Sequence, residues 1–486
     1  MSKVTDLEPK SIWKHFHSLT QIPRPSKKEG RIISFMKSYG ESLGLETIVD
    51  ETGNVIIRKP ATPGCETMRG VVLQAHLDMV PQKNEGTAHD FENDPIETVV
   101  DGEWLKANGT TLGSDNGIGV AAAMAVLESN DIAHGPIEAL FTIDEETGMT
   151  GAKMLKPGLL HGEILLNMDS EDEGELYIGC AGGIDTTGEF TPTFEPVSAD
   201  SAAYRIAVKG LKGGHSGLDI HLGRGNANKL LNTLMLMAAD KFGLRLSEIQ
   251  GGSLRNAIPR EAFATVVVPA SNAADFEAFV SEFEAISKEE FKEADGGLSI
   301  SATPADLPET VIDEKTQDGL FEAVARCPNG VISMTPDMPD VVETSTNLAI
   351  VKSSGEKIII ATLQRSSDDT SKARLAENIR MVFKEAGAEA YSSGDYPGWK
   401  PNVNSPILQT MKKVYNEKYG KIPEVKVIHA GLECGILAGA YPHWDMISFG
   451  PTIRHPHSPD EKVHIGSVGL FWDYLVETLA NIPSKN

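Results

Sequence analysis

Three consecutive carboxylates stand where an apolar run of the sequence stops. The run 139–143 reads as a buried strand, and Asp144, Glu145 and Glu146 follow it directly. Neighbouring side chains diverge at a strand end, so one acid could bind a metal ion while the next reaches a water molecule as general base. Alternatively, Glu145 and Glu146 could be ordinary surface acids. The buried run that ends directly before them makes this interpretation less favoured.

Further ligand-type side chains occur at the ends of other expected elements. His76 and Asp78 follow one apolar run, and Asp169 follows another. Asp115 stands just before an Ala-rich segment that reads as a helix. In open α/β sheets, ligands lie beyond the carboxyl ends of the strands. Imidazoles and carboxylates are typical zinc ligands, and two ions about 3.5–4 Å apart can share one carboxylate. We therefore expect a dinuclear metal centre.

Each of these residues also has a purely structural interpretation. A lone His76 is more often a core histidine, although Asp78 could orient its imidazole. Asp115 could be a helix N-cap, and Asp169 opens an acidic run that is mostly a solvated face. Their joint placement favours the metal centre over these separate roles. Composition leaves three late histidines as candidates for a further ligand: His455, His457 and His464.

The elements that position these residues alternate between strand and helix. Short apolar runs separated by helices predict a mainly parallel sheet covered on both faces. The expected strands are 70–78, 137–143 and 163–168, and the expected helices are 32–43 and 117–129. This texture returns after 395, with a helix ending at 419, a strand near 445–451 and a last helix from 467.

The middle of the chain has a different texture, in which polar and apolar residues alternate as in half-exposed strands. We expect strands at 204–210, 253–258 and 262–268, helices at 226–242, 273–294 and 370–386, and a hairpin turning at Ser354 and Gly355. The predicted architecture is an α/β catalytic domain with a mixed, mainly parallel sheet, formed by 1–186 and 396–486. An α+β lid domain is inserted at 187–395.

Bulk composition narrows the function classes. The 486 residues suit two domains, and 44 basic against 69 acidic residues give a net charge of −25. Such an acidic chain argues against nucleic acid or an anionic membrane as partner. No membrane span or secretory signal is expected from the apolar runs. Four widely spaced cysteines without CxxC favour a reduced, cytoplasmic protein.

Eight phrases, in order along almost the whole chain, resemble the dinuclear zinc exopeptidases of the carnosinase and aminoacylase family. Within it the chain is most similar to the aminoacyl-histidine dipeptidases, also called cytosol non-specific dipeptidases. The long phrases are specific to this subgroup, whereas a bare His-x-Asp is not. They read LQAHLDMVPQ, GTTLGSDNGIGVA, TIDEETGMTGA, NMDSEDEGELYIGCAGGID, KGLKGGHSG, GGSLRNAIPREAFA, HAGLECG and PHSPDEKVHI.

The resemblance implies a role for each matched metal position. His76, Asp115 and Asp169 would hold one zinc ion. Glu146, His457 and the shared Asp115 would hold the second, with His457 selected by the phrase PHSPDE. Manganese and cobalt also suit such a mixed nitrogen and oxygen site.

The resemblance also implies the catalytic and substrate-binding residues. Glu145 would be the general base that activates a water bridging the metals, and Asp78 would orient His76. His215 matches a lid histidine that stabilises the oxyanion, often across a dimer; a plain loop histidine is its alternative. The matched substrate-binding positions are Asn256, Arg365, Gly431 and Glu433. Arg365 could bind a carboxylate through its fork or be a surface charge, and turn chemistry alone could explain the loop 430–435.

We therefore expect a cytoplasmic, homodimeric di-zinc dipeptidase that hydrolyses unblocked dipeptides, preferentially Xaa-His such as β-alanyl-histidine. A tripeptidase or an N-acyl-amino-acid deacylase on the same scaffold is the nearest alternative. A dinuclear phosphoesterase would require basic phosphate contacts, and the sequence shows no cluster of them. A non-enzymatic metal-binding protein is the third alternative, and the presence of Glu145 argues against it.

Overall fold

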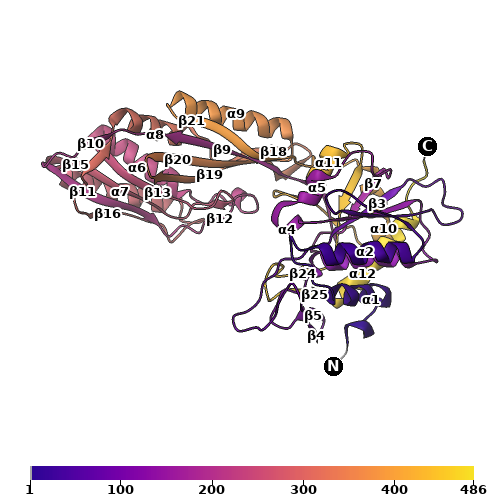
Figure 1. Cartoon of the computed structure of the whole chain (residues 1–486). Coiled ribbons are helices and arrows are strands. Elements are labelled where there is room, and N and C mark those ends of the chain that lie inside the picture. Colours follow the sequence, from indigo (N-terminus) through magenta and orange to yellow (C-terminus); the bar gives the residue numbers. More distant parts are fainter. Residues whose placement is uncertain (1–2, 486) are drawn as a thin grey trace. The chain divides into compact units, whose positions relative to one another are not determined.

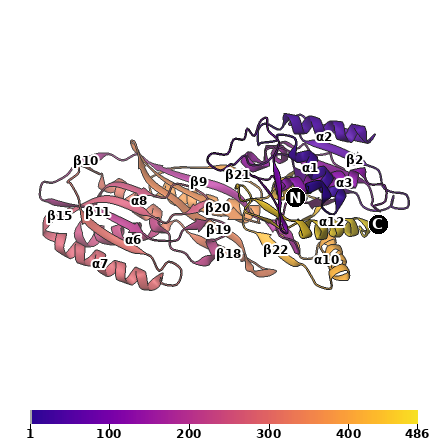
Figure 2. The ribbon, with the colours of Figure 1, turned by 90° about the horizontal axis from the view of Figure 1, so that it is seen from below.

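The computed structural model describes residues 3–485, which divide into two compact units. Unit 1 consists of Met1–Gly179, Trp399–Val427 and Leu432–Asn486. Unit 2 consists of Cys180–Gly398 and Ile428–Gly431. Figure 1 labels the elements of both units, and Figure 2 gives a second view of the same ribbon. No helix in the described part of the chain is long and apolar enough to cross a membrane.

Unit 1 is built on a mixed sheet whose centre is parallel. Among the described residues it has eight strands in the order β1-β2-β6-β3-β7-β23-β8-β22, and β6, β3, β7 and β23 pair in parallel. Every residue of β3, β6 and β7 is buried, as expected for strands covered on both faces. The strands are β1 Glu46–Val49, β2 Val55–Lys59, β3 Val71–His76, β6 Ile137–Thr142, β7 Ile164–Asn167, β8 Glu175–Cys180, β22 Glu424–Ile428 and β23 Asp445–Ser448.

The register of the parallel strands brings their carboxyl ends to one edge of the sheet. His76 pairs with Thr142, so the turn after β6 begins beside the last residue of β3. Gln74 pairs with Asn167, which puts Asp169, two residues further on, level with His76. The apolar pattern of these strands thus fixes where the polar residues that follow them emerge.

Helices and a small sheet complete unit 1. Helix α3 has no polar face: residues 116–127 are all buried, because it packs between β3 and α1. A four-stranded sheet has the order β24-β25-β5-β4. Its strands are β4 Thr98–Asp101, β5 Trp104–Ala107, β24 Ile453–Arg454 and β25 Lys462–His464. His464 ends β25, and His455 and His457 lie in the segment between β24 and β25. The helices are η1 Val4–Asp6, α1 Lys10–Thr20, α2 Gly30–Ser42, α3 Ser114–Glu128, α4 Glu145–Gly148, α5 Thr150–Met154, α10 Pro406–Tyr419, α11 Glu433–Ala440 and α12 Ile465–Ala480.

Unit 2 is an antiparallel sheet with helices that share its hydrophobic core. Its described strands run in the order β16-β11-β15-β13-β19-β20-β9-β21, and β18 pairs with β19. Tyr204, Ile206 and Val208 of β11 point into this core, whereas Arg205 between them is exposed, which is the alternation the sequence predicted. Figure 2 shows α6 and α7 beside β11 and β15.

Three helices of unit 2 begin at side-chain caps. Asn226, Asp313 and Asp368 accept backbone N–H groups at the starts of α6, α8 and α9. The helices are η2 Ile220–Leu222, α6 Ala227–Phe242, η3 Ala270–Asn272, α7 Ala273–Glu290, α8 Glu314–Arg326 and α9 Asp369–Glu385. The strands are β9 Gly182–Phe190, β10 Phe194–Pro196, β11 Ser201–Lys209, β12 Gly214–His215, β13 Arg245–Gly251, β14 Ala257–Ile258, β15 Ala262–Pro269, β16 Ser299–Pro304, β17 Thr310–Ile312, β18 Gly330–Thr335, β19 Met338–Ser354, β20 Lys357–Ser366 and β21 Glu389–Tyr396.

The predicted fold class is confirmed, and two local predictions are wrong. The strand expected at 253–258 is Arg245–Gly251 instead, and only Ala257–Ile258 of the expected range is extended. A register shift between Leu246 and Glu248 breaks the alternation that would have marked it. The hairpin turn lies at Gly355 and Glu356, because Ser354 pairs with Lys357.

Candidate metal centre

His76 is the buried centre of the ligand-type cluster in unit 1. It is the last residue of β3, and its side chain is 1% exposed. Its Nε2 lies 3.1 Å from Oδ1 of Asp115 and 3.3 Å from Oδ1 of Asp169. Its Nδ1 lies 3.4 Å from Oδ1 of Asp78. One imidazole therefore faces two carboxylates with one nitrogen and a third carboxylate with the other.

Asp115 joins this imidazole to a second one. Nε2 of His457 lies 3.1 Å from Oδ2 of Asp115 and 3.0 Å from Oε2 of Glu146. Ligand-type atoms of His76, Asp115 and Glu146 all lie within 4.8 Å of one another. Asp115 thus faces both imidazoles, each with a different oxygen, as a carboxylate shared by two metal ions must do.

The three late histidines have different surroundings. His464 accepts the Ser467 N–H as the N-cap of α12 and packs against the Trp104 ring. His455 is exposed on the surface. Of the three, His457 is the one that meets the carboxylates, so the cluster contains the five side chains that the sequence proposed as ligands.

The three acids after β6 also differ. Asp144 has a left-handed backbone, with φ of 53°, and its carboxylate accepts the hydroxyls of Thr147 and Thr150. It therefore shapes the turn. Asp78 accepts the backbone N–H groups of Glu145 and Glu146 at 3.0 and 3.2 Å, so the same carboxylate that faces His76 also holds this turn.

Glu145 is the acid left without a side-chain partner. Within residues 3–485 its carboxylate forms no hydrogen bond or ion pair, whereas Glu146 faces His457. Burial raises the pKa of Glu145 well above its ordinary value, and the nearby Asp169 adds to the rise. A partly buried carboxylate that lies beside the cluster and has no side-chain partner is suited to accept a proton.

The charges of the cluster call for a cation. Burial raises the pKa of Glu146 and of Asp169. Hydrogen bonds to Asp115 and Glu146 raise the pKa of His457 to about 11. Carboxylates outnumber imidazoles here, and buried negative charge is costly unless it is paired or coordinates a metal.

One buried atom supports the same conclusion. Oε1 of Glu146 has no hydrogen-bond partner among the described residues, although it is shielded from solvent. Unpaired buried carboxylate oxygens are rare in folded proteins. The donor set of nitrogen and oxygen atoms fits a divalent cation such as zinc.

The predicted residues of unit 2 form a separate group. Nδ1 of His215 accepts the backbone N–H groups of Gly217 and Leu218 at 3.2 and 3.1 Å, so Nε2 carries the proton of the neutral ring. Burial lowers the pKa of His215, and nearby Arg365 adds to the effect. A neutral His215 can thus donate a hydrogen bond from Nε2.

Arg365 is buried rather than a surface charge. It is 5% exposed; Nε donates to Ser216 Oγ at 3.2 Å and Nη1 donates to Tyr396 Oη at 3.0 Å. No carboxylate of the described chain forms an ion pair with it. Gly431 lies against Tyr396, since a Cβ there would be 3.1 Å from the ring. Sequence reasoning missed Ser216 and Tyr396, although Ser216 follows His215 directly in the phrase GGHSG.

Asn256 and Glu433 are placed differently from these residues. Asn256 is exposed, and its backbone carbonyl accepts the Ser216 N–H at 2.8 Å. Glu433 belongs to unit 1 and is 1% exposed. Its carboxylate accepts Gln74 Nε2 at 2.6 Å and Thr142 Oγ1 at 2.7 Å, so it is tied to the sheet next to β3 and β6.

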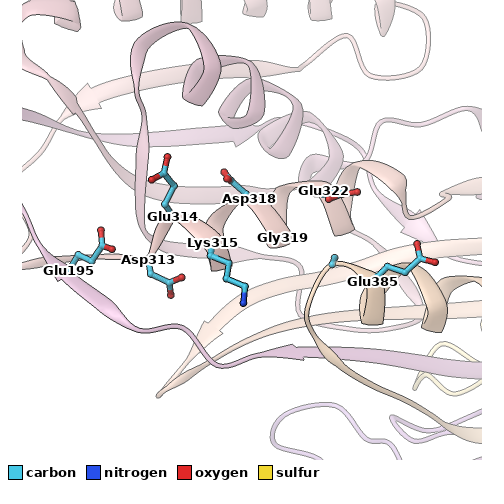
Figure 3. A pocket seen from close by; sticks show the side chains of 9 residues that line it. Glu195, Asp313, Glu314, Lys315, Asp318, Gly319, Glu322 and Glu385 are labelled. Atoms are coloured by element: carbon cyan, nitrogen blue, oxygen red, sulfur yellow. The ribbon is translucent and has the colours of Figure 1, made fainter.

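A hollow elsewhere in unit 2 contains none of the predicted site residues. Figure 3 shows acidic side chains along α8, with Glu385 on α9 at its other side. Asp313 in this hollow caps α8 and also accepts the Thr193 N–H, which is a structural role. The hollow is lined by Glu195, Asp313, Glu314, Lys315, Asp318, Gly319, Glu322, Glu385 and Ala386.

The fold and the cluster define a metallopeptidase scaffold, and comparison with known proteins identifies its family. The chain belongs to peptidase family M20/M25/M40, because the sequence model of that family matches residues 72–481. It is 45% identical over 485 residues to the cytosol non-specific dipeptidase of Escherichia coli, covering 100% of both chains. The predicted class, a hydrolase of peptide bonds, is thereby confirmed.

Comparison with solved structures supports the same family assignment. The aminoacylhistidine dipeptidase of Vibrio alginolyticus is 47% identical, with a TM-score of 0.97 over 100% of this chain and 99% of that one. The aminopeptidase PepT of Bacillus cereus shares the fold at 16% identity, with a TM-score of 0.57 over 98% of this chain and 99% of that one. The resemblance inferred from the eight phrases is therefore confirmed over the full chain.

Proposed function

We propose that this protein is a metal-dependent dipeptidase that hydrolyses unblocked dipeptides, preferentially Xaa-His such as β-alanyl-histidine. The proposal rests on the cluster in which Asp115 faces both His76 and His457. Glu145 lies beside this cluster and has no side-chain partner among the described residues. The full-length similarity to two dipeptidases supports the choice of substrate.

Two zinc ions per subunit fit the cluster, with manganese or cobalt as substitutes. His76, Asp115 and Asp169 would hold one ion, and Asp115, Glu146 and His457 the other. Bound divalent ions supply Lewis acidity, which lowers the pKa of water and polarises a carbonyl oxygen. The unpaired Oε1 of Glu146 and the excess of carboxylates support this assignment.

The protein's own residues then carry the protons and fix the geometry. Glu145 takes a proton from the attacking water and delivers it to the leaving amine. Asp78 faces Nδ1 of His76 at 3.4 Å, so it is placed to orient that ring, and it holds the Glu145 turn by accepting the Glu145 N–H. In unit 2, the Nε2 proton of His215 is available for a carbonyl oxygen that gains negative charge.

Arg365 is proposed to bind the carboxylate of the substrate. It is buried, it forms no ion pair with a carboxylate of the described chain, and its planar fork matches a carboxylate. Asn256, Gly431 and Glu433 remain proposed substrate contacts from the family pattern. The inserted domain is proposed to act as a lid and dimer surface, and the enzyme to work in the cytoplasm.

Product analysis tests this function. The purified, metal-loaded protein is incubated with Ala-His, with Ala-Ala-His and with N-acetyl-histidine. We expect free alanine and histidine from the dipeptide and much slower cleavage of the other two. Preferential cleavage of the tripeptide, or of the acylated amino acid, would replace the dipeptidase proposal with a tripeptidase or a deacylase.

A further inference from the structure

The loop that carries Asp115 is held by a buried carboxylate from the far end of the chain. Glu461 is 2% exposed. Its Oε2 accepts the N–H groups of Leu112 at 2.8 Å and Gly113 at 3.0 Å. Its Oε1 accepts Ser114 N at 2.7 Å, Ser114 Oγ at 2.6 Å and Asp115 N at 3.3 Å. One side chain therefore binds four successive backbone amides that lead to the shared carboxylate.

A buried arginine holds the same loop through a carbonyl. Arg24 is 3% exposed, and its Nη2 donates to the carbonyl of Gly113. Its Nη1 donates to the carbonyls of Leu77 at 2.9 Å and Asp78 at 3.0 Å, in the segment that follows His76. Arg24 thus connects the two chain segments on either side of the contact between His76 and Asp115.

The surrounding glycines are fitted to this arrangement. A Cβ at Gly113 would lie 2.6 Å from Nη2 of Arg24, and a Cβ at Gly117 would lie 2.7 Å from it. Gly113 also has φ of +70°, which disfavours other residues. The two glycines of the phrase GSDNG therefore leave room for the buried Arg24 guanidinium, and the same phrase contains the candidate ligand Asp115.

We propose that Glu461 and Arg24 are positioning residues that fix Asp115 relative to His76 for metal binding. Glu461 fits the role because an ionised carboxylate offers about four acceptor sites and no donor. Arg24 fits it because a planar guanidinium presents donors on two separate nitrogens in a fixed geometry, one toward each segment, whereas a lysine has a single ammonium nitrogen. The inference rests on the proposed function only in taking Asp115 as a metal ligand.

Glu461→Gln tests this role, because it keeps the shape but places an NH₂ donor against backbone N–H donors. Glu138→Gln is the matched control. Glu138 is also buried and accepts backbone N–H groups, from His161 at 2.7 Å and Gly162 at 2.8 Å, but it lies at the start of β6. Depending on how the amide lies, Glu461→Gln removes the acceptor of two or three of five hydrogen bonds. Glu138→Gln removes the acceptor of one or two of three, one of them from Arg58. The control thus reports the general cost of such a change, and a loss of Zn²⁺ affinity beyond it marks the positioning role.

Zn²⁺ affinity is measured by competition with a chelator, together with urea unfolding. Residues that orient metal ligands typically cost about 10–100-fold in metal affinity when changed. We expect a loss of that size in Glu461→Gln, with activity partly restored by excess Zn²⁺, and wild-type affinity in Glu138→Gln. Equal affinities in the two variants would overturn the proposal.

A second pair decides the question if Glu461→Gln does not fold. Arg24→Lys should weaken Zn²⁺ binding, and Arg58→Lys, which changes the arginine paired with Glu138, should not; equal binding would again overturn the proposal. Failure of the proposed function has a different signature. A wild-type protein that leaves Ala-His intact, while Glu461→Gln still weakens Zn²⁺ binding, would reject the dipeptidase and keep the positioning role.

Discussion

Asp78→Asn is the substitution with the most calculable consequences for the metal centre. Asp78 is fully buried. Its Oδ1 accepts Glu145 N at 3.0 Å and lies 3.4 Å from His76 Nδ1. Its Oδ2 accepts Glu146 N at 3.2 Å and Ser26 Oγ at 2.8 Å. An asparagine has one acceptor oxygen, so whichever way its amide lies, two of these four contacts lose their acceptor.

The expected cost follows from that count. Three of the four contacts are hydrogen bonds, and the one with His76 is an ion-pair distance only. Hydrogen bonds to charged groups contribute about 1.5–3 kcal/mol each, so the loss of one or two predicts a destabilisation of about 1.5–6 kcal/mol. The same change leaves His76 and the turn of Glu145 less fixed. Changing such a supporting residue costs about 10–100-fold in metal affinity.

Urea unfolding and chelator competition for Zn²⁺ measure the two effects separately. Asp50→Asn serves as control, because Asp50 accepts the N–H groups of Thr52 and Gly53 at 2.8 Å in a turn outside the cluster. We expect the control to lose stability and to keep its Zn²⁺ affinity. An Asp78→Asn protein with wild-type Zn²⁺ affinity would refute the view that Asp78 orients His76.

Three further predictions concern single residues. Glu145→Gln should lower kcat by about 10²–10⁴-fold with bound metal and stability unchanged, since no side-chain hydrogen bond is lost; full activity in a metal-loaded variant would remove Glu145 as the base. His457→Ala should weaken Zn²⁺ binding in the competition assay, and the exposed His455→Ala should not; equal effects would argue against His457 as ligand. Burial lowers the pKa of His429 to about 3, so the folded state prefers the neutral ring, and stability present above pH 6.5 is lost as the pH falls towards 3. From pH 7 to 5 this one residue should cost about 2 kcal/mol, and His429→Gln should show a correspondingly flatter pH dependence in urea unfolding; an unchanged slope would contradict it.

The positions of the central strands could be predicted because they are buried along their whole length. Uninterrupted apolar runs mark β3, β6 and β7, and in a parallel sheet their polar successors must emerge at one edge. The convergence of His76 and Asp169 follows from this register. Strand β13 escaped prediction because its register shift conceals the period of two.

The different roles of the three neighbouring acids after β6 could not be predicted from residue type. Asp144, Glu145 and Glu146 are chemically alike, and their roles depend on the left-handed backbone at Asp144 and on which N–H groups Asp78 accepts. The family pattern supplied the proposed roles of Glu145 and Glu146, and gave none for Asp144. The geometry adds a physical reason why these two acids differ.

Arg24 and Glu461 show the limit of sequence reasoning most clearly. Neither lies in a periodic element, and each acts on a loop that is distant along the chain: Glu461 is separated from Ser114 by 347 residues. Only the folded backbone brings a carboxylate to those amides. Arg365 is similar, because its position at the end of an apolar strand suggested a surface charge as readily as a buried one.

The central claim is that the cluster around Asp115 binds divalent ions on which dipeptide hydrolysis depends. Metal analysis of the purified protein, paired with Ala-His turnover before and after chelation, tests it most directly. We predict about two divalent ions per chain, loss of turnover when they are removed, and recovery when Zn²⁺ is added back. Undiminished turnover in a protein shown to be free of metal would contradict the claim.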